Sequence, residues 1–442
     1  MKRVAQLLQQ HDLRQALVRL WVLGSNGPRL NTWEQTRSTD EALESERQQF
    51  LTDIQSQVTP SMDRIKAAPL ALIRALDDYI AHTNSPYNTP ARFDTETLAR
   101  TEDGKGYWLA PVVLQARRNA SLNRQACNLG AWFHRHVVLP TETAYGLRVH
   151  INISQSTVSE GFTKLWSDEQ PALKVWIGHF NDAADVQWTR NDIGNWRTAC
   201  VAPQDVRSAS LLTAVASATE AGANIIVFPE FTLDMDHRQA LVRHLYRNPT
   251  PSLFMVLAGS FHETEGHKAF NTAPLYSSDT GETLLTHRKL RIFGDFDHGA
   301  EQVDLGDSVH VLVTPIGCMT VLICKDFLDA HPSVESLLTE VPMDWVLVPS
   351  FGDEKTIRAH KERAKELSVV KTGTHTVVAQ TLNTAVKPVQ PPAECVRGFG
   401  HTAGCKEHEP QVGESGGLVT FPLIQQAPMP PKSARPSLMR IK

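Results

Sequence analysis

Short apolar runs alternate with helical segments over the second half of the chain. Eight runs have the length of buried strands, and they span residues 173–180, 223–229, 253–260, 283–290, 309–314, 318–324, 344–350 and 375–381. Helices are predicted between several of them, over residues 205–221, 235–247, 331–340 and 355–371. Because strands that alternate with helices pack as layers, this pattern predicts an α/β domain.

The first hundred residues have a different, mostly helical pattern. Residues 1–24 mix apolar and charged positions as an amphipathic helix does, and residues 72–80 place apolar side chains on one helical face. Ser38 and Glu41 have the spacing of a capping box, which predicts a helix that continues through Ile54. Residues 81–96 are rich in turn formers and predict a linker.

These patterns divide the chain into four parts. We expect a mostly helical region over 1–105 and a connecting region over 106–171, with a strand within residues 146–154. The α/β domain follows over 172–425, and a flexible, Pro-rich basic tail over 426–442.

Composition and charge indicate an ordinary globular protein. Hydrophobic residues make up 41% of the 442 residues and charged residues 21%, and the net charge is −4. This balance gives no general reason to expect nucleic acid or an anionic membrane as partner. No apolar run approaches a membrane span, and the N-terminal segment does not have the pattern of a signal peptide. Six cysteines do not form a disulfide framework, so we expect a cytoplasmic location.

Three residues with complementary chemistry follow predicted strands. Glu230 follows "NIIVFP", Lys289 ends "LLTHRK" and Cys324 ends "TVLI", and such strand ends are where α/β folds collect functional side chains. A carboxylate can take the thiol proton, the thiolate can attack an electrophilic carbon, and an ammonium can stabilise the resulting negative charge. Each residue alone also has a purely structural explanation. Cys324 could be a core cysteine, Glu230 a carboxylate that opens a helix, and Lys289 a basic surface residue.

Four stretches taken together resemble the carbon–nitrogen hydrolase family, also called the nitrilase superfamily. They are "GANIIVFPE", "THRKLRIFGDF", "IGCMTVLICKD" and "DWVLVPS", in the order typical of that family. The separations of 59 residues from Glu230 to Lys289 and of 35 from Lys289 to Cys324 are also typical of it. The resemblance covers about residues 172–425 and implies a four-layer α-β-β-α sandwich, with no metal or organic cofactor.

The resemblance also implies roles for particular residues. Glu230 matches the general base, Lys289 the stabiliser of the tetrahedral intermediate, and Cys324 the nucleophile. A second acid after the lysine often supports the site. Glu301 is the candidate for it, with Asp295 and Asp297 as alternatives.

The chain departs from the family pattern on both sides of the nucleophile. Thr320 replaces a usual glycine, and Lys325 stands where relatives usually have an aromatic residue. Lys325 is therefore a substrate-pocket candidate that would favour an anionic substrate. One alternative is that Lys325 lies on the surface. Another is that the protein binds a ligand without converting it.

Two clusters invite a zinc interpretation that we reject. His262 and His267 are five residues apart, whereas a helical zinc motif needs four, so "FHETEGHK" is predicted to be a polar loop. Cys395, His401, Cys405 and His408 lie within one stretch, but their spacing matches no familiar zinc finger. We therefore expect no metal site.

The sequence thus predicts a hydrolase that cleaves a non-peptide amide, or a nitrile, through a thioester on Cys324. One alternative is an N-acyltransferase. Another is a nitrilase-like effector that acts with a partner chain, for example a defence-associated reverse transcriptase. Since relatives commonly self-associate, we expect a dimer or larger homo-oligomer. The N-terminal region is a candidate surface for a protein partner.

Overall fold

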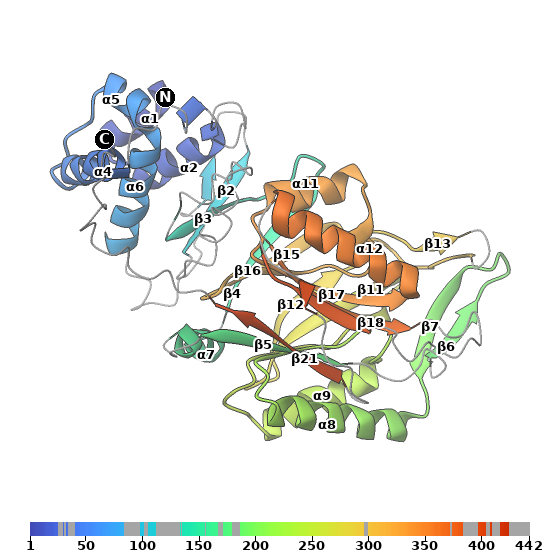
Figure 1. The fold of residues 1–442 in the computed structure, drawn as a ribbon. Helices are drawn as coiled ribbons and strands as arrows, with labels where there is room; N and C mark the ends of the chain where they lie inside the picture. The colour runs from blue at the N-terminus through green and yellow to red at the C-terminus, as the bar shows by residue number, and fades with distance from the viewer. Residues whose placement is uncertain are drawn as a thin grey trace, which may run out of the picture.

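Two sheets of seven strands each dominate the part of the chain that the computed structural model describes (Figure 1). The described residues are 1–24, 30, 32–33, 40–83, 98–100, 105–111, 133, 135–154, 156–166, 171–178, 186–295, 299–371, 374–382, 397–403, 407–408 and 416–423.

The first sheet contains β5 (Ala172–Gly178), β8 (Ile225–Val227), β9 (Met255–Leu257), β10 (Phe261–Glu265), β11 (Lys268–Ser277), β12 (Thr283–Arg288) and β21 (Gly416–Pro422). Its order is β10-β11-β9-β8-β5-β21, and β12 pairs with β11. The second sheet contains β4 (Arg148–Ile153), β15 (Ser308–Thr314), β16 (Gly317–Val321), β17 (Trp345–Gly352), β18 (His375–Leu382), β19 (Gly398–His401) and β20 (Glu407–His408). Its order is β20-β19-β18-β17-β16-β15-β4.

Helices cover the outer face of each sheet, so the layers run α-β-β-α (Figure 1). Helices α8 (Gln204–Glu220) and α9 (Met235–Arg247) pack on the first sheet. On the second sheet lie α11 (Pro332–Glu340) and α12 (Glu354–Lys365), and α12 continues as a π-helical turn over Glu366–Lys371. This arrangement confirms the predicted four-layer sandwich.

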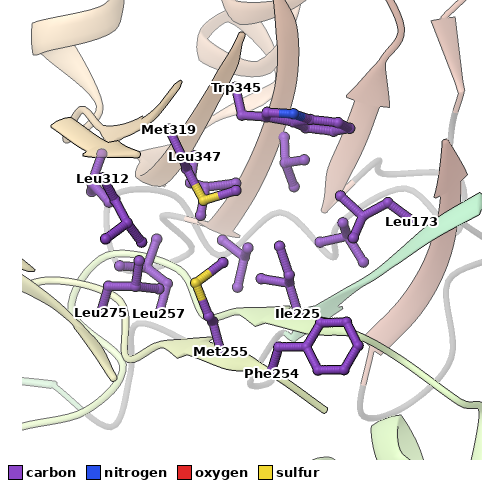
Figure 2. Close-up of a cluster of buried hydrophobic side chains, with 14 of the residues drawn as sticks. Leu173, Ile225, Phe254, Met255, Leu257, Leu275, Leu312, Met319, Trp345 and Leu347 are labelled. Carbon is purple, nitrogen blue, oxygen red and sulfur yellow. The ribbon is translucent and has the colours of Figure 1, made fainter. Parts of the chain in front are cut away.

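The strands are apolar on both faces because each face meets another layer. In β8, Ile225 and Val227 point between the sheets, whereas Ile226 packs against α8 and α9. In β17, Trp345 and Leu347 point into the same inner layer, which Figure 2 shows. Burial on both faces explains why the sequence shows continuous apolar runs here instead of a polar–apolar alternation.

The eight predicted strands and four predicted helices are all present, but other elements were not predicted. "FHETEGHK" was expected to be a polar loop, and that prediction was wrong. It forms β10, the turn at Gly266 and the start of β11, because the antiparallel pairing of His262 with Asn271 buries both side chains. Strands β19, β20 and β21 were not predicted either. Further unpredicted elements include β6 (Val186–Arg190), β7 (Trp196–Val201), β13 (Gly294–Asp295), β14 (Gly299–Ala300), α7 (Ser156–Trp166) and α10 (Lys325–Leu328).

The N-terminal region is helical, as predicted, with a core of its own. Its helices are α1 (Lys2–Gln9), α2 (Leu13–Gly24), α4 (Asp40–Gln55), α5 (Met62–Ala67) and α6 (Pro69–Thr83). The first 24 residues form two helices instead of the single helix expected, because the chain turns at His11, where φ is 57°. Ser38 and most of the predicted linker lie outside the described residues.

A small sheet joins the helical region to the sandwich. It contains β1 (Leu98–Arg100), β2 (Gly106–Pro111) and β3 (His136–Pro140). On β3, Val138 packs into the helical core, whereas Val137 and Leu139 pack with the second sheet and its helices. The predicted strand at 146–154 is β4, which pairs in parallel with β15. The second sheet therefore includes a strand from before residue 172.

No helix among the described residues is long and apolar enough to cross a membrane.

Candidate active site

The ends of strands from both sheets meet at one place in the sandwich. Glu230 follows β8, Lys289 follows β12 and Cys324 follows β16, and their exposed fractions are 1%, 2% and 5%. The backbone of β17 connects two of them, since Glu230 N donates to Ser350 O (3.3 Å) and Cys324 N donates to Pro349 O (2.9 Å). The structure thus brings the three sequence-predicted residues into one buried site.

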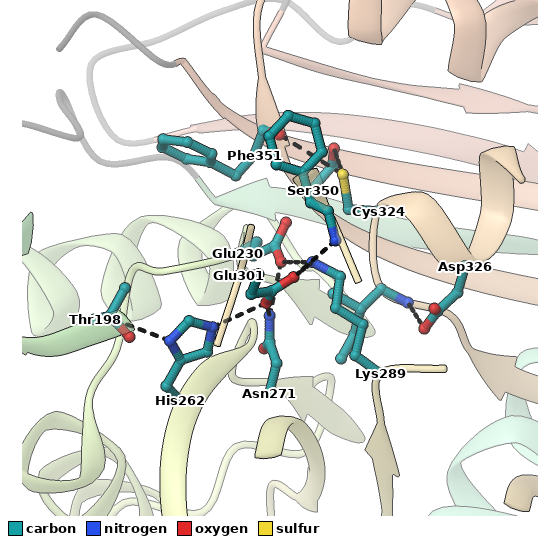
Figure 3. Close-up of polar contacts among 12 residues, drawn as sticks. Thr198, Glu230, His262, Asn271, Lys289, Glu301, Cys324, Asp326, Ser350 and Phe351 are labelled. Carbon is teal, nitrogen blue, oxygen red and sulfur yellow. Dashed lines mark hydrogen bonds and ion pairs between the residues drawn. The ribbon is translucent and has the colours of Figure 1, made fainter. Parts of the chain in front are cut away.

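The Lys289 ammonium lies between two carboxylates (Figure 3). Its Nζ is 2.8 Å from Glu230 Oε1 and 2.8 Å from Glu301 Oε2. Asn271 Nδ2 donates to Oε1 of both acids, at 2.8 Å in each case. One lysine and one amide therefore fix both carboxylates.

Glu301 has further donors that Glu230 does not share. His262 Nε2 lies 2.9 Å from Glu301 Oε1, and Phe293 N donates to Oε2 at 3.2 Å. Because His262 Nδ1 accepts from Thr198 N (2.9 Å), its proton is on Nε2, and the ring donates to Glu301. Glu301 is therefore surrounded by donors.

The two carboxylates titrate in different ranges as a result. Burial raises the pKa of Glu230 to about 7, although the Lys289 charge opposes this. Burial acts on Glu301 in the same direction, but Lys289 and His262 outweigh it and hold its pKa at about 2. At neutral pH Glu301 is an anion, whereas Glu230 exchanges a proton, which is a division of roles often seen in acid–base sites.

The thiol of Cys324 is held in its neutral form. Burial and the Glu230 carboxylate raise its pKa to about 12, and Lys289 opposes them. Burial would lower the pKa of Lys289, but Glu230 and Glu301 outweigh it and keep the ammonium charged. Ser350 Oγ donates to Cys324 Sγ (3.4 Å), which in turn donates to Phe351 O (3.6 Å).

The backbone at Cys324 is strained. Its φ of 43° and ψ of −100° lie outside the regions that side chains with a Cβ favour, and the residue forms the sharp turn from β16 into α10. Such strain costs on the order of 1–3 kcal/mol and persists where the surrounding structure imposes it. In some hydrolases of a different fold, a strained turn from strand to helix presents the nucleophile.

This strain predicts an unusual response to glycine. Because glycine adopts positive φ readily, Cys324→Gly should be at least as stable as Cys324→Ala. At Cys318, a buried cysteine in β16, the corresponding glycine variant should be less stable than the alanine variant by roughly 1 kcal/mol. Urea unfolding of the four variants measures both differences. A Cys324→Gly variant clearly weaker than Cys324→Ala would show that the strain is absent.

Asp326 ties the lysine segment to the cysteine turn. Its buried carboxylate accepts from Leu290 N (2.9 Å) and from Ile323 N (3.2 Å), and His287 Nε2 lies 2.9 Å from it. Leu290 and Ile323 are the direct neighbours of Lys289 and Cys324. One side chain therefore connects the backbone beside Lys289 to the backbone beside Cys324.

The other sequence candidates have different positions. Lys325 is partly buried in α10. Burial acts to raise the pKa of Asp329, but the Arg291 guanidinium, the His331 amide and the Lys325 charge together lower it. The role of Lys325 as a substrate-pocket residue stays a prediction.

Of the three acids considered, Glu301 contacts Lys289, while Asp297 and the Asp295 side chain lie outside the described residues. So do Cys395 and Cys405, and the residues that are described contain no cluster suited to a metal.

Sequence reasoning missed His262, Asn271, Ser350 and Asp326. Ser350 had a signal, because it follows "VLVP" as Glu230 follows "IVFP". Asn271 lies in β11, which was not predicted, and His262 was assigned to a loop. Both reach the site only through pairing of β10 with β11, which the local sequence does not reveal.

A family match lies within the sandwich. Residues 204–328, which include Glu230, Lys289, Glu301 and Cys324, match the family model described as carbon-nitrogen hydrolase. Residues 204–328 therefore carry a domain of the carbon–nitrogen hydrolase superfamily. The comparison with curated proteins gives no match.

Solved structures of an amidase from Nesterenkonia sp. are similar to the chain. One has 18% identity and a TM-score of 0.40, and the match covers 57% of this chain and 90% of that one. A mutant of that amidase, with acrylamide added at its active site cysteine, has 17% identity and a TM-score of 0.39, with coverages of 57% and 93%.

Proposed function

We propose that the protein hydrolyses a non-peptide amide through a thioester on Cys324. The observation that carries this proposal is the buried Glu230–Lys289–Glu301 cluster beside a strained cysteine. It supplies a base near neutrality, a fixed positive charge and a nucleophile in one place.

The first half of the reaction forms the thioester. The Cys324 proton moves to Glu230 as Sγ bonds to the carbonyl carbon, and the Lys289 ammonium stabilises the resulting oxyanion. The C–N bond then breaks, and Glu230 returns the proton to the leaving nitrogen. Ammonia or an amine departs, and the acyl group stays on sulfur.

The second half releases the acid. Water attacks the thioester while Glu230 takes its proton, and a second oxyanion forms beside Lys289. The C–S bond breaks, the proton passes from Glu230 to the sulfur, and the carboxylic product leaves. Since the full cycle begins and ends with a neutral thiol, the same carboxylate serves both halves.

Glu230 is the better base of the two acids. Glu301 is held as an anion with a pKa of about 2 and is surrounded by donors, so it is a poor proton acceptor. At Glu230, Lys289 and Asn271 both donate to Oε1, which leaves Oε2 as the atom we assign to proton transfer. We propose that Glu301 acts by holding Lys289 in place.

These pKa values predict how reactivity depends on pH. A thiol with a pKa of about 12 holds almost no thiolate at rest, so proton transfer to Glu230 must accompany attack. Labelling of Cys324 by iodoacetamide should therefore rise with pH around 7, where Glu230 loses its proton, and not around the ordinary thiol value.

Peptide mass spectrometry of labelled samples at several pH values measures this rate. The partly exposed Cys200 is the reference thiol in the same sample. Glu230→Gln should remove the step near pH 7 at Cys324 and leave Cys200 unchanged. A step near pH 9 at Cys324 in the unmodified protein would contradict the assignment of Glu230 as base.

The substrate can be sought in a complex mixture of metabolites. The protein and its Cys324→Ala variant are each incubated with a cell metabolite extract, followed by untargeted mass spectrometry. An amide that disappears only with the unmodified protein, with its acid appearing, supports the proposal. Identical profiles across broad extracts would count against hydrolysis.

A further inference from the structure

A hairpin outside both main sheets is anchored to the site. Strands β6 and β7 lie between β5 and α8 in the chain and pair with each other (Figure 1). On β7, Val201 N donates to Asp234 Oδ2 (2.8 Å) and Thr198 N donates to His262 Nδ1 (2.9 Å). Gln302 N donates to Trp196 O (2.9 Å), directly beside Glu301. The hairpin is thus fixed relative to the charged cluster.

The hairpin brings aromatic rings to residues that adjoin the catalytic candidates. The ring of Trp188, on β6, lies 5.4 Å from that of Phe231, 5.7 Å from that of Phe351 and 5.1 Å from that of Trp196. Phe231 directly follows Glu230, and the Phe351 carbonyl accepts from the Cys324 thiol at 3.6 Å. The aromatic cluster therefore borders both the base and the nucleophile.

Two of these four rings remain partly exposed. Trp196 and Phe231 are buried, with exposed fractions of 7% and 1%, and they support the cluster from inside. Trp188 and Phe351 are only partly buried and pack against it. Because partly exposed rings offer large apolar faces, a substrate group that covered them would remove apolar surface from water.

From this placement, we propose that Trp188 and Phe351 bind a flat apolar group of the substrate beside the scissile amide. The preferred substrate is therefore an amide with an aromatic group near the C–N bond, on its acyl or its amine side. Trp188 is a specificity-determining residue contributed by the hairpin. The kinetic test of this inference rests on the proposed hydrolase function, whereas the binding test does not require turnover.

The kinetic experiment compares kcat/KM for phenylacetamide and N-benzylacetamide with kcat/KM for acetamide. The unmodified protein should prefer at least one aromatic amide. Trp188→Ala and Trp188→Leu should each reduce that preference about tenfold, whereas Trp188→Phe should retain most of it. Thr189→Ala, an exposed position on the same strand, is the matched control and should keep the preference unchanged. The amide whose preference falls identifies the side that carries the ring.

The binding experiment uses Cys324→Ala, which cannot turn over substrate. Calorimetry should show tighter binding of an aromatic amide than of acetamide, and about tenfold weaker binding once Trp188→Leu is added. If the aromatic amides bind no better than acetamide, or if Trp188→Leu weakens all amides equally, the subsite is wrong even where turnover is found. If binding follows the expected order but no amide is hydrolysed, the subsite is supported and the hydrolase proposal fails. Thermal unfolding of each variant shows whether a loss reflects unfolding.

Discussion

Cys324→Ala is expected to reduce amide turnover on the order of 10³-fold or more and to abolish electrophile labelling at this position. The reason is that each half-reaction passes through a bond to its sulfur, so no other group in the site can replace it. Stability should change little. The thiol makes two weak contacts, with Ser350 and Phe351, and Ser350 Oγ can still donate to Gln380 Oε1, 3.5 Å away.

Cys318→Ala is the matched control for this change. Cys318 is also buried in the second sheet, but its side chain packs in the outer apolar cluster, away from the charged residues. That variant should retain turnover and labelling at Cys324. Turnover that survives Cys324→Ala would exclude a cysteine mechanism.

The second large effect distinguishes the roles of Glu230 and Lys289, whose side chains contact each other. Glu230→Gln should abolish turnover while the protein stays as stable as before, because glutamine keeps the shape and the remaining Lys289–Glu301 pair is neutral overall. Lys289→Met should abolish turnover and also destabilise the fold by roughly 3–5 kcal/mol, because it leaves buried carboxylates without their cation. Activity assays with urea unfolding of both variants measure this contrast.

The pH dependence of stability offers a check on this contrast. Since the folded pKa of Glu230 is raised, its contribution to stability is fully present below its ordinary value near 4.5 and is lost as pH rises through about 7. The stability of Glu230→Gln relative to the unmodified protein should therefore improve between pH 4.5 and 7. Equal stability losses in Glu230→Gln and Lys289→Met at neutral pH would contradict the charge arrangement described for the cluster.

Much of the sandwich could be predicted because its strands are buried on both faces. Within "NIIVFP" and "DWVLVPS", the segments "IIVF" and "WVLV" are apolar throughout, and each is followed by a proline and then a polar residue. The proline and polar residue located Glu230, whereas Cys324 was located by the end of the apolar run "TVLI". The contact of Glu301 with Lys289 could be anticipated only through the family resemblance, since nothing local in the sequence marks that acid.

The site residues and elements that were not predicted depend mostly on contacts between segments far apart in the sequence. His262 and Asn271 reach the acids only when β10 and β11 pair, and the polar sequence around Gly266 hides that hairpin. The hairpin that carries Trp188 is half exposed and short, so its apolar pattern is weak. In the N-terminal region, the break at His11 follows from a positive φ, which the amphipathic pattern does not reveal.

The central claim is that an acyl group is transferred to Cys324. Its most direct test is to mix the protein with an amide that it consumes, quench with acid within the first turnovers, and determine the mass of the Cys324 peptide. The account predicts a mass increase equal to the acyl group on Cys324, absent from Cys324→Ala and reversed by hydroxylamine. Turnover with an unmodified Cys324 peptide, or an acyl group on another residue, would contradict it.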